Sequence, residues 1–159
     1  MALAEVREQI QKFVANATNA PVWEYERVVK TKKQIEDIGT TVDSKGERLI
    51  HVWMITVEAD DAVPDTPEEQ ADFTFDRIYT FVLRGYRSLD DAEGSGMEWQ
   101  DTIEAILSIF DTNPTLGGKA VRSGPPIGRV RDDHRAFGDW GCHYAEISLD
   151  ATLKVSRVA

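Results

Sequence analysis

The sequence has very little cysteine, since Cys142 is the only one among 159 residues. An internal disulfide is therefore excluded, and a hydrophobic core must hold the fold together. Runs of about 18 apolar residues, which a membrane-spanning helix requires, are also lacking. Residues 1–16 carry Glu5, Arg7 and Glu8 in place of the uninterrupted apolar core of a signal peptide. We therefore expect a soluble protein that folds in a reducing cytoplasm and has no membrane partner.

Basic residues are also scarce relative to acidic residues. The chain has 18 Lys and Arg against 28 Asp and Glu, which gives a net charge of −10. The imbalance is concentrated in residues 61–112, whereas residues 113–159 contain more basic than acidic residues. Tight DNA binding needs cations that displace counterions from phosphates, so this composition argues against a protein that grips DNA. An acidic surface would still let DNA slide past without adhering; the alternative is that it only keeps the domain in solution.

Motifs for nucleotide binding are missing. The pair Gly118-Lys119 looks like the end of a phosphate-binding loop, but the position five before Gly118 is Asn113 instead of glycine. Ala120 also stands where a serine or threonine would bind magnesium. No Gly-x-Gly-x-x-Gly opens a predicted helix. We therefore expect no cofactor.

The histidines do not form a recognisable metal site. Asp132-Asp133-His134 contains residue types that bind metals, but adjacent residues of an extended chain point apart. Its spacing also lacks the i, i+4 geometry of a strong histidine motif. A polar loop is the simpler interpretation. His51 and His143 fall on the apolar faces of predicted strands, a position typical of core or interface histidines with satisfied hydrogen bonds.

Two candidate nucleophiles also lack the setting that catalysis requires. Cys142 is followed by His143, but neighbouring residues of a strand face opposite sides and cannot form a nucleophile–base pair. Ser95 lies in Gly-Ser-Gly without the preceding strand of a nucleophile elbow, so we interpret it as part of a flexible linker. No catalytic residue and no metal ligand is assigned, and we predict that the protein is not an enzyme. A small hydrolase or metal-binding domain that uses His134 is the less favoured alternative.

The hydrophobic content is that of one folded domain. Apolar residues make up 42% of the chain and include four tryptophans, which is enough for a core at this length. Residues 2–16 and 97–111 have the three- and four-residue spacing of amphipathic helices. The apolar stripe of the second helix consists of Trp99, Ile103, Ile106, Leu107 and Phe110. Pro114 and the pair Gly117-Gly118 should end that helix.

Four segments have the patterns of strands. Segment 142–155 alternates along its length, with mostly apolar odd-numbered residues and mostly polar even-numbered ones. Segment 49–57 is apolar on both faces, as expected of a central strand or of one covered by subunit contacts, and 73–86 should pair with it in an antiparallel arrangement. Segment 22–30 is shorter and rich in β-prone residues. The order of elements predicts a single α+β domain over 1–159, with a mainly antiparallel sheet flanked by two principal helices.

Two connecting segments are predicted to be flexible loops. The first, about 59–71, is acidic and punctuated by proline, and the second, about 119–141, contains glycine, proline and arginine. Opposite charges on two patches of one chain suit a head-to-tail contact between copies. The alternative is that both segments are merely solvated loops. A subunit contact of this kind would use Asp60, Asp61, Glu68, Glu69, Arg122, Arg129, Arg131 and Arg135.

The order of elements over 97–155 is similar to that of a known family. A helix runs into Asn113-Pro114-Thr115-Leu116-Gly117-Gly118, and after a variable stretch the closing strand reads Tyr144-Ala145-Glu146-Ile147-Ser148-Leu149-Asp150-Ala151-Thr152-Leu153. Together with the short N-terminal helix and the β-rich middle, this pattern resembles the tail terminator proteins of tailed bacteriophages, the minor tail protein U-like family.

The resemblance implies an α+β virion subunit of the tail neck that is assembled in the host cytoplasm and forms a homo-hexameric ring. Such a ring binds the tail tube protein, ends polymerisation of the tube and joins it to the head–tail connector or stopper protein. DNA passes through the lumen of the ring without specific binding. The alternatives are that the chain is itself a head–tail connector, a stopper or another neck protein, or an unrelated interaction adaptor.

Overall fold

The computed structural model describes residues 3–25, 38–42, 48–64, 73–89, 94–124, 126–130, 135–137 and 140–157. Two helices and eight strands are present in these ranges. In chain order they are α1 (Leu3–Thr18), β1 (Val22–Trp23), β2 (Thr40–Val42), β3 (Arg48–Pro64), β4 (Phe73–Ser88), α3 (Ser95–Thr112), β5 (Arg122–Ser123), β6 (Ile127–Val130), β7 (Arg135–Phe137) and β8 (Trp140–Arg157). This is the α+β domain that the sequence predicts.

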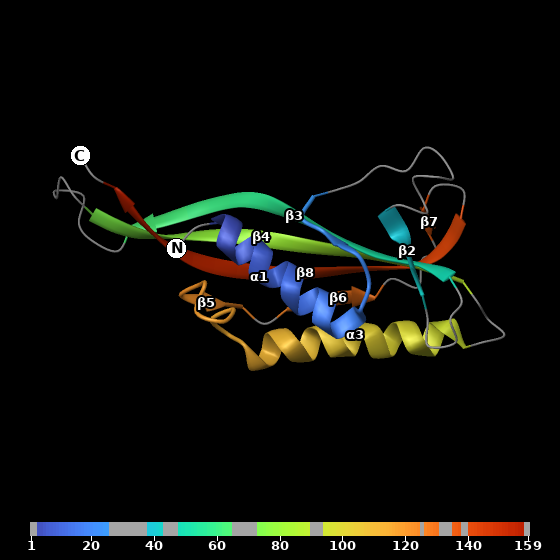
Figure 1. Ribbon diagram of the computed structural model, residues 1–159. Helices are drawn as coiled ribbons and strands as arrows, with labels where there is room; N and C mark the ends of the chain where they lie inside the picture. The colour runs from blue at the N-terminus through green and yellow to red at the C-terminus, as the bar shows by residue number, and fades with distance from the viewer. Residues whose placement is uncertain are drawn as a thin grey trace.

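The sheet is built around three long strands. β3 pairs with β4, and β4 pairs with β8, both antiparallel, and the three strands run along most of the length of the molecule (Figure 1). β1 lies parallel to β3 on the side away from β4, and β2 pairs with the first residues of β3. β5, β6 and β7 follow one another along the side of β8 that is away from β4. The described strands thus form one mixed sheet with a single parallel pairing.

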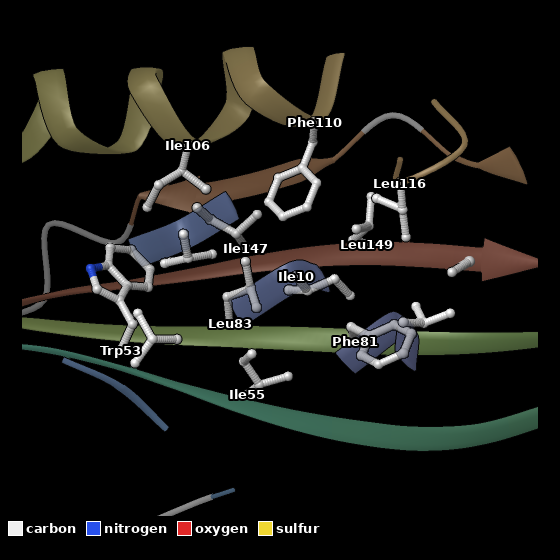
Figure 2. Packing of buried hydrophobic residues seen from close by; sticks show 14 of the residues in the cluster. Ile10, Trp53, Ile55, Phe81, Leu83, Ile106, Phe110, Leu116, Ile147 and Leu149 are labelled. Carbon is white, nitrogen blue, oxygen red and sulfur yellow. The ribbon is translucent and has the colours of Figure 1, made fainter. Parts of the chain in front are cut away.

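Both helices cover the same face of this sheet. In Figure 2, Ile106 and Phe110 of α3 point toward Ile147 and Leu149 of β8. The main core contains apolar residues from every layer: Val6, Ile10 and Val14 from α1; Trp99, Ile103, Ile106 and Phe110 from α3; and Trp53, Ile55, Phe81, Leu83, Ala145, Ile147 and Leu149 from the sheet. Complete burial of a large aliphatic or aromatic side chain contributes about 1.5–3 kcal/mol, so this core dominates the stability of the domain. None of the helices in the described part of the chain has the length and apolarity needed to cross a bilayer.

A second, smaller core lies on the opposite face of the sheet. It contains Ile38, Ile50, Val52, Met54, Phe137 and Cys142. The segment around β7 contributes Phe137, whose ring lies directly over Gly39, so that a Cβ added at Gly39 would come within 2.6 Å of it. The apolar residues on both faces of segment 49–57 are explained by these two cores. Within the described ranges β3 has a strand on both sides only at Trp53 and Met54, so the prediction of a central strand is confirmed for that part of the segment alone.

The turn after α3 stops the helix as predicted. Asn113 caps the C-terminus, and its backbone N–H donates to the carbonyl oxygen of Phe110. Leu116, Gly117 and Gly118 then adopt positive φ angles of 51°, 67° and 82°. Glycine accepts this left-handed conformation at no steric cost, whereas Leu116 holds it because its side chain is fully buried in the main core.

Both segments predicted to be loops are in part strands, which corrects the sequence interpretation. β3 continues to Pro64, so residue 59 and residues 62–64 of the expected acidic loop pair with β4. Within the expected loop 119–141, β5, β6 and β7 all pair with β8. The backbone of a long neighbouring strand supplies the hydrogen bonds for these pairings, so no alternating apolar pattern is needed. The predicted strand 22–30 is shorter in the structure, where β1 spans Val22–Trp23; residues 26–30 lie outside the described ranges.

Candidate subunit interface

The register of the three long strands decides which residues share a face. Residues directly opposite each other in an antiparallel pair project to the same side of the sheet. Odd-numbered residues of β8 such as Ile147 and Leu149 lie in the main core beneath the helices. Even-numbered residues such as Glu146 and Thr152 therefore lie on the other side, which neither α1 nor α3 covers and which we call the helix-free face. The helix-free face is the surface on which the candidate interface residues can be placed.

Polar side chains on the helix-free face are tied to one another across the strands. Arg84 Nη1 of β4 donates to Thr56 Oγ1 of β3 at 2.7 Å, and Arg84 Nε lies 3.7 Å from Glu146 Oε1 of β8. The Tyr144 hydroxyl donates to the same Glu146 oxygen at 2.5 Å. Further along the strands, the Thr80 hydroxyl donates to Asp150 Oδ1 at 2.7 Å. Hydrogen bonds and an ion pair between polar side chains thus link the three long strands on this face.

Acidic residues lie along the edge formed by β3. A β-bulge interrupts the pairing of β3 with β4, because Ala59 pairs with Tyr79 and Ala62 pairs with Arg77. Asp60 and Asp61 occupy the bulge, and Glu58 precedes it. Glu58 is opposite Thr80, so its position belongs to the helix-free face. Over residues 57–64, this edge contains three acidic residues and no basic residue.

Arginines lie along the opposite edge, which β5, β6 and β7 form. Arg122 of β5 is opposite Thr152, and Arg129 of β6 is opposite Glu146. Arg135 of β7 is opposite Cys142. All three partners are even-numbered residues of β8, so the three arginine positions also belong to the helix-free face. These three short strands contain no acidic residue.

Acidic and arginine positions thus lie at opposite edges of the sheet, with β4 and β8 between them. The structure places Asp60 and Asp61 together at the acidic edge. It places Arg122, Arg129 and Arg135 on successive strands of the other edge. The remaining expected interface residues, Glu68, Glu69 and Arg131, lie outside the described ranges. Asp132, Asp133 and His134, which the sequence offers as metal ligands, lie outside them as well.

Ser95 is not in a linker, and that interpretation was wrong. It is the first residue of α3 and is 2% exposed, and its Oγ lies 2.9 Å from Nε2 of His143. A second link between α3 and the sheet joins Glu98 to Arg87 of β4, the residue opposite His143. These contacts fix the first turn of α3 on the sheet. The serine and the histidine are 48 residues apart in sequence, so only the register of β8 reveals the pair.

His51 is a core histidine, as the sequence predicts. The residue is 4% exposed, and its Nε2 accepts a hydrogen bond of 3.0 Å from Trp53 Nε1. Trp53 stacks on Trp99 of α3 with ring centroids 5.3 Å apart, and Trp99 meets the His51 ring edge-on. Burial, and then the nearby Arg87, lower the pKa of His51 from 6.5 to about 3. The neutral ring therefore acts as a structural hydrogen-bond acceptor at physiological pH.

Cys142 is a packed thiol. It is fully buried in the smaller core, on the face opposite to that of His143. Burial raises the pKa of its thiol from 9.0 to about 11, so the sulfur stays protonated at neutral pH. A protonated, buried thiol is a poor nucleophile and a poor metal ligand. The prediction that Cys142 and His143 do not form a nucleophile–base pair is confirmed.

Comparisons with known proteins add no further identification: no protein-family model matches the chain, and no curated protein matches it.

Proposed function

We propose that the chain is a structural subunit that assembles into a ring, in the manner of the phage tail terminators that its sequence resembles. The observation that carries the proposal is the placement of acidic and arginine positions at opposite edges of the sheet, with Glu58 and the three arginine positions on the helix-free face. A contact between two different edges is heterologous, and heterologous contacts form closed rings when the rotation between copies closes. Cross-strand hydrogen bonds and the Arg84–Glu146 ion pair link β3, β4 and β8, so the two edges keep fixed positions relative to each other.

Charge complementarity would give this contact its direction. The acidic edge of one copy attracts the arginine edge of the next, and two like edges repel each other. Asp60 and Asp61 meet the arginines only in the head-to-tail arrangement or in a face-to-face dimer with two-fold symmetry. The mass of the assembly separates these arrangements, because a ring has more than two copies.

The remaining parts of the proposed function rest on the resemblance and on the overall charge. The ring would cap the tail tube, end its polymerisation and offer its other side to the head–tail connector or stopper. DNA would pass through the lumen at ejection, and the net charge of −10 suits passage without adhesion. The alternative within the virion is that the same ring is itself a connector, a stopper or another neck component.

The experiment is a measurement of mass and shape with the whole chain. Six copies of 17.8 kDa give about 107 kDa, which light scattering coupled to size exclusion distinguishes from a monomer or a dimer. Negative-stain microscopy of the same fractions should show rings, and rings added to tail tubes should sit at tube ends. A strict monomer at high concentration and in the presence of tubes would refute the proposal. Rings that bind the head connector and ignore tube ends would favour the connector alternative.

A pair of variants with the same change in net charge tests the edge itself. Asp60→Lys/Asp61→Lys reverses the acidic edge and should leave a monomer, because lysines then face arginines. Asp101→Lys/Glu104→Lys makes the same change in charge on exposed positions of α3 and should still form rings. Loss of rings in both variants would point to total charge instead of the edge, and rings in both would exclude the edge from the contact.

A further inference from the structure

The outer edge of β3 has backbone groups that point away from the rest of the sheet. The Trp53 N–H donates to the carbonyl oxygen of Pro21 at 3.0 Å, and Pro21 lies on the β1 side of β3. Peptide groups alternate in direction along a strand. The N–H groups of Val57 and Ala59 therefore point to the same outer side, away from β4.

This part of the edge is not paired in the described structure. β1 accompanies β3 only at Trp53 and Met54, and no strand within the described ranges pairs with β3 beyond Met54 on that side. Regular pairing with β4 continues to Ala59, where the bulge begins. The edge thus offers a regular stretch, 55–59, that is closed at one end by β1 and at the other by the bulge. Such an edge is a template for a strand from another chain.

We propose that β3 residues 55–59 receive β6 of a second copy by backbone pairing, so that the sheet continues from one subunit to the next. This inference rests on the proposed ring and states how its subunits join. β6 spans four residues, Ile127–Val130, which fits the five-residue stretch between β1 and the bulge. In the described part of the chain, β6 pairs with β8 alone, so its other side has no strand partner.

The charges favour pairing of β3 with β6 of the second copy over pairing with its β3. Pairing of β3 with β3 of another copy would bring two acidic edges together, with Glu58 and the bulge residues Asp60 and Asp61 of each copy near those of the other, and like charges repel each other. Pairing with β6 brings Arg129 toward them instead. Both positions belong to the helix-free face, so the joined sheets keep their helices on one common side.

Amide hydrogen exchange, resolved to single residues by NMR or by fragmentation mass spectrometry, tests this pairing. The protein is compared as assembled rings and as the monomer obtained by dilution. We expect the amides of Val57 and Ala59 to exchange fast in the monomer and at least about tenfold more slowly in the ring. The amides of Thr56 and Glu58 serve as internal controls, because they face β4 and should be slow in both states.

Each other outcome overturns the inference and is distinguishable from failure of the ring. If Val57 and Ala59 are slow in the monomer as well, the chain itself covers this edge. If they are fast in both states, the subunits join through side chains alone, and the proposed ring stands without the strand pairing. If no ring forms at all, the proposed function fails, and this inference falls with it.

A proline variant gives an independent test. Val57→Pro removes an N–H that does not pair with β4, a position where an edge strand tolerates proline. We expect a folded monomer with the near-ultraviolet circular dichroism of the wild type, whereas Val57→Thr, which keeps the N–H, should form rings. Rings of Val57→Pro would overturn the inference; if this variant does not fold, the exchange experiment decides.

Discussion

Substitution of Gly85 by alanine should disrupt the packing between the sheet and α3. Gly85 lies between Trp53 of β3 and Ala145 of β8 in the register of the sheet. A Cβ built on Gly85 would lie 2.5, 2.6 and 2.6 Å from three ring carbons of Trp53. Real Cβ atoms do not approach other carbons so closely, so the indole must move. Its movement is opposed by Trp99, on which it stacks, and by the hydrogen bond to His51.

The expected loss of stability follows from these contacts. Forcing extra volume into a packed core costs about 1–3 kcal/mol. Displacement of Trp53 also weakens an aromatic pair worth about 0.5–1.5 kcal/mol. We therefore expect Gly85→Ala to lower the free energy of unfolding by about 2–4 kcal/mol.

The assay is urea unfolding followed by tryptophan fluorescence and by far-ultraviolet circular dichroism. Gly124→Ala is the matched control, because its Cβ would meet only the Cβ and backbone oxygen of Asp150 at ordinary distances of 3.8 and 3.9 Å. A change within about 0.5 kcal/mol is expected there. Gly85→Ala combined with Trp53→Phe should cost less than the sum of the two single changes, because the smaller ring makes room for the methyl group. The packing argument would be refuted if Gly85→Ala were as stable as the wild type. It would also be refuted if the double variant lost the full sum of the two single losses.

Three further predictions concern other buried residues, His51, Ser95 and Leu116. The pKa of His51 is about 3 in the folded protein and 6.5 in the unfolded chain. Between pH 3 and pH 6.5 the unfolded chain therefore binds more protons than the folded protein. The free energy of unfolding should therefore fall by about 2 kcal/mol from pH 7 to pH 5, and His51→Gln should flatten that dependence in urea titrations. Ser95→Ala should cost about 1 kcal/mol through loss of the His143 contact, whereas Ser108→Ala on the exposed side of α3 should be neutral. Leu116→Ala should cost about 2–5 kcal/mol in the same assay, since the side chain is fully buried.

The main elements were predictable because each has a strong periodic pattern. The stripe from Trp99 to Phe110 needs only local sequence, and so does the alternation in segment 142–155. The end of α3 at Asn113 follows from proline and glycine, whose backbone preferences do not depend on tertiary structure. The two helices and the three long strands are therefore largely local properties of the chain.

The parts that were mispredicted depend on pairing with distant residues. Residues 59–64 and the strands β5 to β7 have weak patterns of their own and become strands because β4 and β8 lie beside them. The Ser95–His143 contact depends on the register of β8 in the same way. For the candidate interface, sequence alone supplies the two charged groups. Their separation to opposite edges of the sheet follows only from the order of the strands.

The central claim is that each subunit meets the next through two different, oppositely charged edges. The most direct test mixes two variants, Asp60→Lys/Asp61→Lys and Arg122→Glu/Arg129→Glu/Arg135→Glu, each checked for the wild-type circular dichroism. Either variant alone places like charges at every contact and should remain a monomer of about 17.8 kDa. An equimolar mixture restores opposite charges at every contact when the variants alternate, so light scattering should find closed rings of six that contain both in equal amounts. A mixture that stays monomeric, or rings of either variant alone, would contradict the claim.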